Sequence, residues 1–256
     1  MIQFEILSGV GKITLDRPDK YHSFVREMAL TLQETLDKCN DNKDVKAILI
    51  TATGKAFCAG QDLSEAIDPN GPDLTQIVQE HYNPIIRKIR NIEKPIVAAV
   101  NGVAAGAGAS IALCCDIVVA CESATFIQAF SKIGLIPDSG GTFFLPRLVG
   151  MQKAAALMMT AEPVLAKDAE AMGMIYKVFS DENFEEESWK LVSKLAGMPT
   201  KGLGLTKRLL NASYSNNLEQ QLDMEDKCQT IAGNTTDFKE GIEAFFEKRK
   251  ANFKGE

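Results

Sequence analysis

A run of small residues in the middle of the chain constrains the fold more than any other feature. The stretch is Pro95–Asp116, PIVAAVNGVAAGAGASIALCCD. It predicts a buried strand, a turn at Asn101-Gly102 and an apolar helix that begins near Gly106. Because glycine has no Cβ, Gly102, Gly106 and Gly108 permit a sharp turn and the close approach of a ligand or another chain segment. The stretch therefore predicts a site built largely from main chain.

The start of this predicted helix is a candidate anion site. Its first N–H groups lack acceptors within the helix and lie at the positive end of the helix dipole, so they favour an anion or a developing oxyanion. The alternative is a small-residue helix that only packs tightly against a sheet, and the stretch alone leaves both interpretations open. Spacing excludes a dinucleotide-binding loop, because Ile111 stands where the third glycine would be.

Composition excludes several classes of function. The net charge of −6 and the pI near 5.2 argue against a nucleic-acid partner, which requires clustered Lys and Arg. We see neither a signal-peptide pattern nor an apolar run of membrane-spanning length, so we expect a cytoplasmic protein without membrane contact. The six cysteines have no C-x-x-C spacing and are predicted to be reduced core residues. With only two histidines and no ligand spacing, we expect no metal.

Strands and helices alternate along the rest of the chain. Residues 2–15 predict two strands around a glycine turn, and a helix should run from Ser23, as N-cap, to about Asn40. A buried strand at 45–51 leads into a loop at 54–62, a helix follows at 74–89, and His81 should lie at its surface. Further strands are expected at 117–120, 125–128 and 176–179. This order predicts an α/β fold with a parallel sheet in residues 1–195 and a helical region in residues 196–256.

Two loops offer main-chain N–H groups for chemistry. They are Ala59-Gly60-Gln61 and Gly106-Ala107-Gly108, and each follows a predicted strand. Two N–H groups from separate strand ends that converge on one oxygen form an oxyanion hole without any special side chain. A Ser-His-Asp triad is not expected, because the chain lacks a G-x-S-x-G elbow.

A third loop carries one carboxylate, Asp138, beside Gly140-Gly141 at the start of a predicted helix. Asp138 has two interpretations, an N-cap or a catalytic acid–base group, and the residues leave both open. An apolar pocket formed by Phe130, Leu135 and Ile136 would raise its pKa toward the range useful for proton transfer.

These three loops, in this order, resemble those of the enoyl-CoA hydratase/isomerase (crotonase) superfamily. The resemblance covers about Phe4 to Phe253 and depends on the combination LDRPDKYHSF, AFCAGQDL, KPIVAAVNGVAAGAGASIALCCDI, GLIPDSGGTFFLPRLVG and AMGMIYKV. It implies an α/β, crotonase-like spiral of ββα units with a helical C-terminal trimerisation region. It also implies a homotrimer or dimer of trimers, and an acyl-CoA thioester as substrate with no separate cofactor.

The resemblance assigns roles to individual residues. The N–H groups of Gln61 and Ala107 match the family's oxyanion hole, and Asp138 matches a catalytic aspartate. Segments 20–23 and 59–63 would contact the CoA adenine, and Lys20 or a C-terminal lysine from a neighbouring subunit would lie near the phosphates. The full set of implied substrate-binding residues is Lys20, His22, Ala59, Gly60, Asp62, Leu63, Gly106, Gly108, Ser110 and Phe130.

The residues at the matched positions also indicate the reaction. Hydratases of the family use two glutamates, but here Ser110 and Phe130 stand at those positions, so hydration should be absent or slow. Asp138 matches an aspartate of dienoyl-CoA isomerases and of ring-epoxide isomerases in phenylacetate degradation. Four motifs are most similar to those of the second group, the 2-(1,2-epoxy-1,2-dihydrophenyl)acetyl-CoA isomerases. They are HYNP, VNGVAAGAGAS, AFSKIGLIPDSGGT and GLGLTKRLLN.

The resemblance therefore implies an acyl-CoA isomerase that moves a proton and a double bond through a thioester enolate. Expected reactions are ring-epoxide phenylacetyl-CoA to oxepin-CoA and 3-enoyl-CoA to 2-enoyl-CoA. The alternatives are a dienoyl-CoA or fatty-acid enoyl-CoA isomerase, or a non-catalytic acyl-CoA-binding protein of the same fold.

Overall fold

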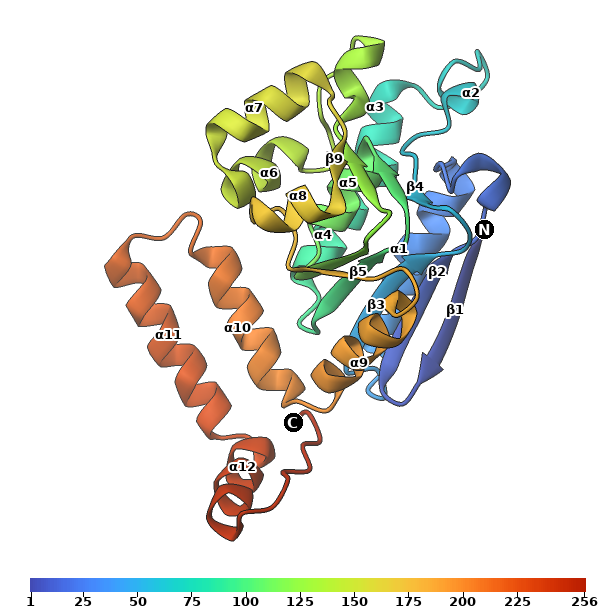
Figure 1. The fold of residues 1–256 in the computed structure, drawn as a ribbon. Helices are drawn as coiled ribbons and strands as arrows, with labels where there is room; N and C mark the ends of the chain where they lie inside the picture. Colours follow the sequence, from blue (N-terminus) through green and yellow to red (C-terminus); the bar gives the residue numbers. More distant parts are fainter.

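The strands divide between two sheets in the computed structural model, which describes residues 1–256 (Figure 1). The first sheet has the order β1-β2-β3-β5-β7-β10, and the second has the order β4-β6-β8-β9. Only the β1–β2 and β8–β9 pairs are antiparallel. The strands are β1 (Ile2–Leu7), β2 (Val10–Leu15), β3 (Ala47–Ala52), β4 (Ala56–Cys58), β5 (Ile96–Val100), β6 (Val103–Ala105), β7 (Ile117–Cys121), β8 (Thr125–Ile127), β9 (Val164–Leu165) and β10 (Lys177–Phe179).

Three successive segments each contribute two strands, one to each sheet, and then enter a helical segment. The strand pairs are β3 with β4, β5 with β6, and β7 with β8. This repeat confirms the predicted spiral of ββα units. It also corrects two predictions: β4 lies within the loop expected at residues 54–62, and β6 lies between the turn at Asn101-Gly102 and the helix, where no strand was expected. The strand β9 was also missed, because a segment of two residues shows no alternation in a sequence.

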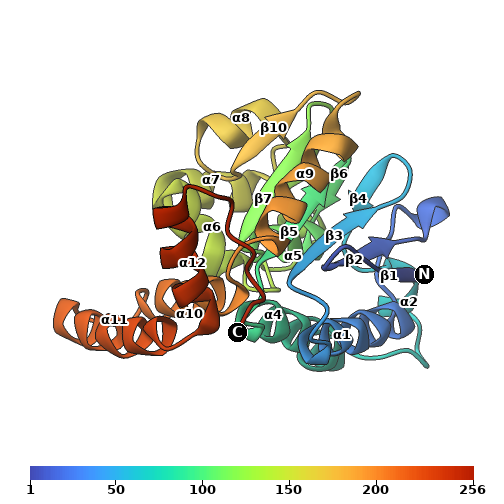
Figure 2. The same cartoon turned by 90° about the horizontal axis from the view of Figure 1, so that it is seen from below.

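Helices cover both faces of the first sheet. Figure 2 shows α1 and α4 on one side of this sheet and α9 on the other. The helices of the core are α1 (Arg26–Asp41), α2 (Leu63–Ala66), α3 (Leu74–Gln76), a π-helix (Ile77–Tyr82), α4 (Asn83–Asn91), α5 (Ala107–Leu113), α6 (Gly141–Val149), α7 (Met151–Thr160), α8 (Ala166–Ala171) and α9 (Phe184–Ala196), with 3₁₀ turns at Pro18–Lys20 and Ala129–Ile133.

The first helix packs as its spacing predicts but begins later. Met28, Leu32 and Leu36 recur every four residues and are buried against the core. Ser23 is not its N-cap, because the helix begins at Arg26 after an extended Val25 that provides no side-chain cap. The Ser23 hydroxyl instead accepts a hydrogen bond from Arg17 Nη1 at 3.2 Å.

The π-helix overturns one prediction about a side chain. His81 was expected at the surface, yet His81 and its neighbour Tyr82 are both 0% exposed. A regular α-helix turns successive residues by about 100°, whereas a π-turn fits an extra residue into one turn. This altered register brings two adjacent side chains to the interior, which an α-helical pattern does not anticipate.

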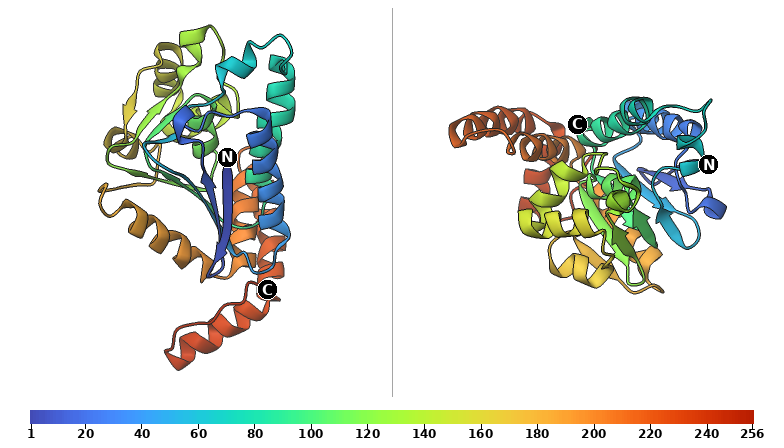
Figure 3. Two further views of the ribbon diagram at one scale, coloured as in Figure 1. Left: turned by 90° about the vertical axis from the view of Figure 1, so that its right-hand side faces the viewer. Right: turned by 90° about the horizontal axis from the view of Figure 1, so that it is seen from above.

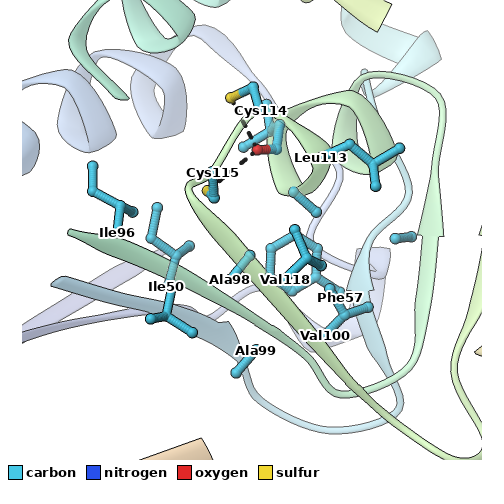
Figure 4. Packing of buried hydrophobic residues seen from close by; sticks show 14 of the residues in the cluster. Ile50, Phe57, Ile96, Ala98, Ala99, Val100, Leu113, Cys114, Cys115 and Val118 are labelled. Carbon is cyan, nitrogen blue, oxygen red and sulfur yellow. Dashed lines mark hydrogen bonds between the residues drawn. The ribbon is translucent and has the colours of Figure 1, made fainter. Parts of the chain in front are cut away.

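The core is built from apolar strand residues and the buried helix α5. Figure 4 shows Ile50, Ile96, Ala98, Val100 and Val118 packed near the cysteine pair that follows this helix. The sulfurs of Cys114 and Cys115 both lie within hydrogen-bonding distance of the Ile111 carbonyl, at 3.1 and 3.4 Å. All six cysteines are buried and unpaired in the structure, which confirms their prediction as core residues.

Two glycines bring consecutive turns of the spiral into main-chain contact. A Cβ at Gly102 would lie 2.2 Å from the Lys55 carbonyl oxygen, and one at Gly108 would lie 2.3 Å from the Cys58 carbonyl oxygen. Real Cβ atoms do not approach that closely, so no other residue fits either position without a shift of the backbone. The small-residue run therefore packs α5 tightly onto β4, as its composition predicts.

Three helices project beyond the sheets at the C-terminal end of the chain. They are α10 (Thr200–Ala212), α11 (Leu218–Gly233) and α12 (Thr236–Glu247), and Figures 1 and 3 show α11 and α12 projecting away from the core. Their surface is unusually apolar, with Phe245 and Phe246 at 78% and 76% exposure. No helix of the protein combines the length and apolarity needed to cross a membrane.

The helix α10 fixes this projecting region to the core. The buried Lys207 ammonium pairs with Asp116 Oδ2 at 2.8 Å and donates to the Ile89 carbonyl at 2.6 Å. Gly204 lies directly on the α4–β5 connection, where a Cβ would be 2.3 Å from the Glu93 carbonyl oxygen. The helix is thus held by a buried charge and by one close backbone contact.

We expect Gly204→Ala to destabilise the protein by about 1–3 kcal/mol, because the added methyl must push α10 away from Glu93. The matched control is Gly202→Ala in the same helix, where the added methyl would meet only Pro199 at 3.8 Å. That control should be neutral or stabilising by up to about 1 kcal/mol, since alanine favours helix. Thermal unfolding at one protein concentration measures both, and equal effects would contradict the close-contact argument.

Candidate active site

The two predicted main-chain loops meet beside the start of α5. Gly60 has φ +93°, and a Cβ there would lie 3.1 Å from the Ala105 carbonyl oxygen and 3.4 Å from the Ala107 nitrogen. Glycine therefore allows the loop after β4 to pass directly across the loop after β6. A parallel bridge fixes the first loop: Phe24 N donates to the Gly60 carbonyl at 2.7 Å, and Asp62 N donates to the Phe24 carbonyl at 2.8 Å.

Each loop leaves one N–H group without a protein acceptor. The Gln61 N–H lies between the two bonds of the bridge and donates to no protein atom. The Ala107 N–H is the first of α5, whose N-cap Gly106 turns sharply with φ +53° and provides no side-chain acceptor. These are donors that a carbonyl oxygen or an oxyanion can satisfy, with the dipole of a short helix behind one of them.

The third predicted element, Asp138, lies in a turn of unusual backbone conformation. Ser139 and Gly140 both have positive φ, at +51° and +73°, and Gly141 N donates to the Asp138 carbonyl at 2.8 Å. Left-handed non-glycine residues are uncommon and cluster at functional sites. The N-cap of α6 is Gly140, which excludes the N-cap interpretation of Asp138.

The Asp138 carboxylate is half-buried and holds one direct hydrogen bond. Burial raises its pKa above the ordinary value for aspartate, although the hydroxyl of Ser139, which donates to Oδ1 at 2.9 Å, opposes the shift. The predicted apolar wall is only partly present. Phe130 is buried, but Leu135 is exposed and Ile136 is 78% exposed. The left-handed Gly134 that ends the preceding 3₁₀ helix precedes these two exposed residues.

Two buried polar groups face the start of α6 and have no partner. The side chains are Ser110 and Gln128, 1% and 5% exposed, whose Oγ and Oε1 make no hydrogen bond in the protein. A Cβ at Gly141 would lie 2.8 Å from the former atom and 3.5 Å from the latter. The ring of Phe130 is similarly close to Gly106, at 3.9 Å from such a Cβ. Ser110 and Phe130 thus both lie near these loops, and sequence analysis missed Gln128.

The side chains of two residues predicted to contact the ligand make hydrogen bonds within the protein instead. The buried His22 accepts from Arg17 N at 2.9 Å through Nδ1 and donates to the Thr53 carbonyl at 2.7 Å through Nε2, and burial lowers its pKa. Asp62 caps α2 by accepting from Ser64 N at 3.1 Å and pairs with Arg17 Nη2 at 2.8 Å. The main-chain N–H groups are engaged as well, since His22 N donates to the Arg17 carbonyl at 3.0 Å and Asp62 N to the Phe24 carbonyl at 2.8 Å.

The structure brings together the two segments expected to contact adenine. Ala59 N donates to the Tyr21 carbonyl at 2.9 Å, which joins residues 20–23 to residues 59–63. Lys20 is exposed at the end of a 3₁₀ turn, and Leu63 is exposed as the first residue of α2. Both side chains are therefore accessible beside the two-loop site.

The amide of Gln61 is itself held, by residues that sequence analysis did not identify. Tyr82 OH donates to Gln61 Oε1 at 2.8 Å, and Gln61 Nε2 donates to Glu65 Oε2 at 2.8 Å. The motif HYNP contains the tyrosine, but no spacing rule links it to a residue 21 positions earlier.

Comparison with known proteins places this geometry in a family. The model of the enoyl-CoA hydratase/isomerase family matches residues 5–256. The 1,2-epoxyphenylacetyl-CoA isomerase of Escherichia coli K12 is 44% identical over 96% of this chain and 95% of its own. A probable enoyl-CoA hydratase of Rhodobacter capsulatus is 40% identical over 99% and 98%. A putative enoyl-CoA hydratase/isomerase from Mycobacterium abscessus superposes with a TM-score of 0.93 at 33% identity, over 99% of both chains.

The two-sheet spiral and its paired main-chain donors define a crotonase-fold protein. The chain belongs to the enoyl-CoA hydratase/isomerase family. This confirms the resemblance stated from the motifs, and the relatives confirm that the chain is a member of an enzyme family with isomerases among its members.

We expect Asp138→Asn to stabilise the protein at neutral pH. The folded pKa of Asp138 lies above its unfolded value, so the folded state binds more protons between the two values. Its contribution to stability is therefore present below the unfolded pKa and is lost as pH rises through the folded pKa. The asparagine variant should unfold at a higher temperature than the wild type at pH 7. This difference in unfolding temperature should become smaller toward pH 3. A lower unfolding temperature at pH 7 would contradict the burial argument.

Proposed function

We propose that the protein is an acyl-CoA isomerase in which Asp138 is the single proton carrier. The observation that supports this most directly is the combination of one half-buried carboxylate of raised pKa with two unpaired N–H groups from neighbouring loops. A carboxylate with a raised pKa is better matched to proton transfer near neutral pH. The donors stabilise the negative charge that develops on a thioester oxygen when a proton leaves the adjacent carbon.

The proposed reaction moves one proton without adding or removing any other atom. The thioester carbonyl accepts hydrogen bonds from Gln61 N–H and Ala107 N–H. Asp138 takes a proton from the substrate, the electron pair delocalises into the thioester as an enolate, and the same carboxyl returns the proton at the vinylogous carbon. A 3-enoyl-CoA thus becomes a conjugated 2-enoyl-CoA, and the aspartate ends as it began.

The side chains present disfavour addition of water. Ser110 and Phe130 stand where the hydratases that the chain resembles carry two glutamates, and neither can act as a general base at neutral pH. The nearby Glu65 carboxylate is engaged, because it accepts from Gln61 Nε2 and from Arg26 N at 2.8 and 2.9 Å. Asp138 is therefore the proposed acid–base group.

The proposed substrate is a ring-epoxide phenylacetyl-CoA, opened to the oxepin-CoA. Support comes from the 1,2-epoxyphenylacetyl-CoA isomerase that is 44% identical to this chain. A trans-2-decenoyl-[acyl-carrier-protein] isomerase of Streptococcus mutans is 32% identical over 99% of the chain, which keeps an aliphatic enoyl isomerase as the second candidate. The oxyanion hole and Asp138 are common to both proposals, and the substrates alone separate them.

The proposal includes a homotrimer, alone or as a dimer of trimers. The projecting helices α11 and α12 expose Leu218, Phe238, Phe245 and Phe246, more apolar surface than an isolated chain normally shows. Ile136, beside the Asp138 turn, is likewise exposed. Association of copies would cover such surface and complete the surroundings of the site.

We expect Asp138→Asn to reduce isomerisation of cis-3-enoyl-CoA by about 10²–10⁴-fold, the usual contribution of a general acid–base group. Asparagine is nearly isosteric and can still accept from Ser139, so folding and CoA-ester binding should persist. The matched control is Asp181→Asn, since Asp181 is exposed and bonds Ser123, away from these loops. Substrate turnover and product spectra measure both variants.

Hydration of crotonyl-CoA is assayed in parallel and should be absent or slow. Hydration that survives Asp138→Asn would show that other pocket acids have been overlooked, and full isomerase activity in the variant would reject Asp138 as the base. A higher kcat/KM on the ring epoxide than on cis-3-enoyl-CoA supports the phenylacetyl substrate. The reverse order favours the aliphatic candidate.

Sedimentation should give a mass three or six times the chain mass of 27.9 kDa. Replacing both exposed rings, as Phe245→Ser with Phe246→Ser, removes apolar contact area and should shift the population toward smaller species. The control is Tyr176→Ser, which removes an exposed ring from the α8–β10 connection instead. A monomeric wild-type protein at micromolar concentration would contradict the proposed assembly.

A further inference from the structure

The side chain of Tyr82 lies in the interior although its hydroxyl is polar. Tyr82 is 0% exposed, and its ring packs edge-on against Phe24 with centroids 6.0 Å apart. The hydroxyl donates to Gln61 Oε1 at 2.8 Å. A buried tyrosine needs such a partner, because an unsatisfied hydroxyl in the interior costs about 1–3 kcal/mol.

The bond from Tyr82 is one half of a clamp on a single amide. The other half is the bond from Gln61 Nε2 to Glu65 Oε2, and the other oxygen of Glu65 accepts from Arg26 N at 2.9 Å. One end of the amide must accept from a hydroxyl and the other must donate to a carboxylate. This pattern fixes the orientation of the Gln61 side chain, and only an amide satisfies both partners.

The clamp acts on a residue whose main chain is also held on both sides. Phe24 bonds Gly60 and Asp62, the neighbours of Gln61, and leaves the Gln61 N–H free. With both flanking peptide groups and the side chain fixed, the direction of this N–H has little freedom. The same Phe24 supports the ring of Tyr82, so one small cluster controls both restraints.

An irregular helix brings the hydroxyl to Gln61. The π-helix Ile77–Tyr82 turns both His81 and Tyr82 inward, and π-turns are rare and frequent at functional sites. It meets α4 at Asn83-Pro84, where proline lacks an N–H and removes one donor from the helical ladder. The packing of a regular α-helix would not bury these two neighbours together.

We propose that Tyr82 is a positioning residue that directs the Gln61 N–H toward the thioester oxygen. This inference rests on the proposed function, because it gives Tyr82 a role in forming the oxyanion hole. The hydroxyl remains a donor through the working pH range, since burial, with the nearby Cys58 and Asp138, raises the pKa of Tyr82 well above its ordinary value. The alternative is a tyrosine that only fills the core.

The test is Tyr82→Phe, which removes the hydroxyl and keeps the ring against Phe24. We expect kcat for cis-3-enoyl-CoA to fall about 10–100-fold, because small misplacements of a catalytic donor have effects of this size. KM should change by less than about threefold, since a donor that acts mainly in the transition state affects kcat more than ground-state binding. Affinity for free CoA, which has no thioester carbonyl, should be unchanged.

A second readout reports the oxyanion hole without turnover. The absorption of bound 4-(dimethylamino)cinnamoyl-CoA moves to longer wavelength when hydrogen bonds polarise its carbonyl. Wild type should show this shift, and Tyr82→Phe should reduce it. Gln61→Met removes this bond together with the bond to Glu65 and keeps the Gln61 N–H, so it should reduce kcat and the shift at least as much as Tyr82→Phe does. The double variant should show little loss beyond that of Gln61→Met alone, which is the signature of coupled residues.

The control is Thr35→Val, which also removes a buried hydroxyl. Thr35 lies on α1 and donates only to the Thr31 carbonyl at 2.7 Å, so it should lower stability without changing kcat or the absorption shift. If Tyr82→Phe and Gln61→Met both retain wild-type kcat and shift, Tyr82 only fills the core and the inference is wrong. If Tyr82→Phe folds poorly, Gln61→Met becomes the deciding variant, because the side chain of Gln61 is only half-buried.

The two readouts distinguish this inference from the proposed function. A wild-type protein that shifts the bound thioester but isomerises nothing would refute the isomerase proposal, and the shift in the variants would then decide the role of Tyr82. A wild-type protein with neither turnover nor shift would overturn both.

Discussion

The site depends on the direct contact between main-chain segments of consecutive turns of the spiral. Gly102 and Gly108 lie against the carbonyls of Lys55 and Cys58, where a side chain of any size would force the segments apart. This contact sets the spacing between the ends of β4 and β6, and thereby the positions of the two unpaired N–H groups. This packing therefore forms the candidate oxyanion hole as well as the core.

A second constraint acts at the start of β5, in the first sheet. One carboxylate, Asp116, accepts from Ile96 N at 2.9 Å, pairs with Arg90 at 3.1 Å and receives the buried Lys207 at 2.8 Å. Burial lowers the pKa of Lys207, while Asp116 favours its charged form. The start of β5, the end of α4 and the projecting helix α10 are thus joined at one point. The apolar surface of the C-terminal helices is held in a fixed direction relative to the site.

Much of this arrangement follows from the sequence, because long apolar runs and glycine turns have strong local signals. The strands β3, β5 and β7, the helix α1 and the cysteine-lined core were predicted from such signals. The short strands β4, β6 and β9 were missed, and His81 was misplaced because a π-turn breaks helical periodicity. The exposure of Ile136 and the clamp on Gln61 depend on how distant segments pack, which no local pattern encodes.

The unpaired donors at Gln61 and Ala107 belong to the main chain, and this has a consequence for the divergence of the protein. Most single substitutions leave an amide hydrogen in place, so mutation seldom deletes this part of the site, and proline is the chief exception. Side chains such as Asp138, Ser110 and Phe130 are replaceable one at a time around it. New reactions can therefore evolve around a candidate oxyanion hole that is inherited almost intact, which is consistent with relatives named as hydratases, isomerases and dehalogenases.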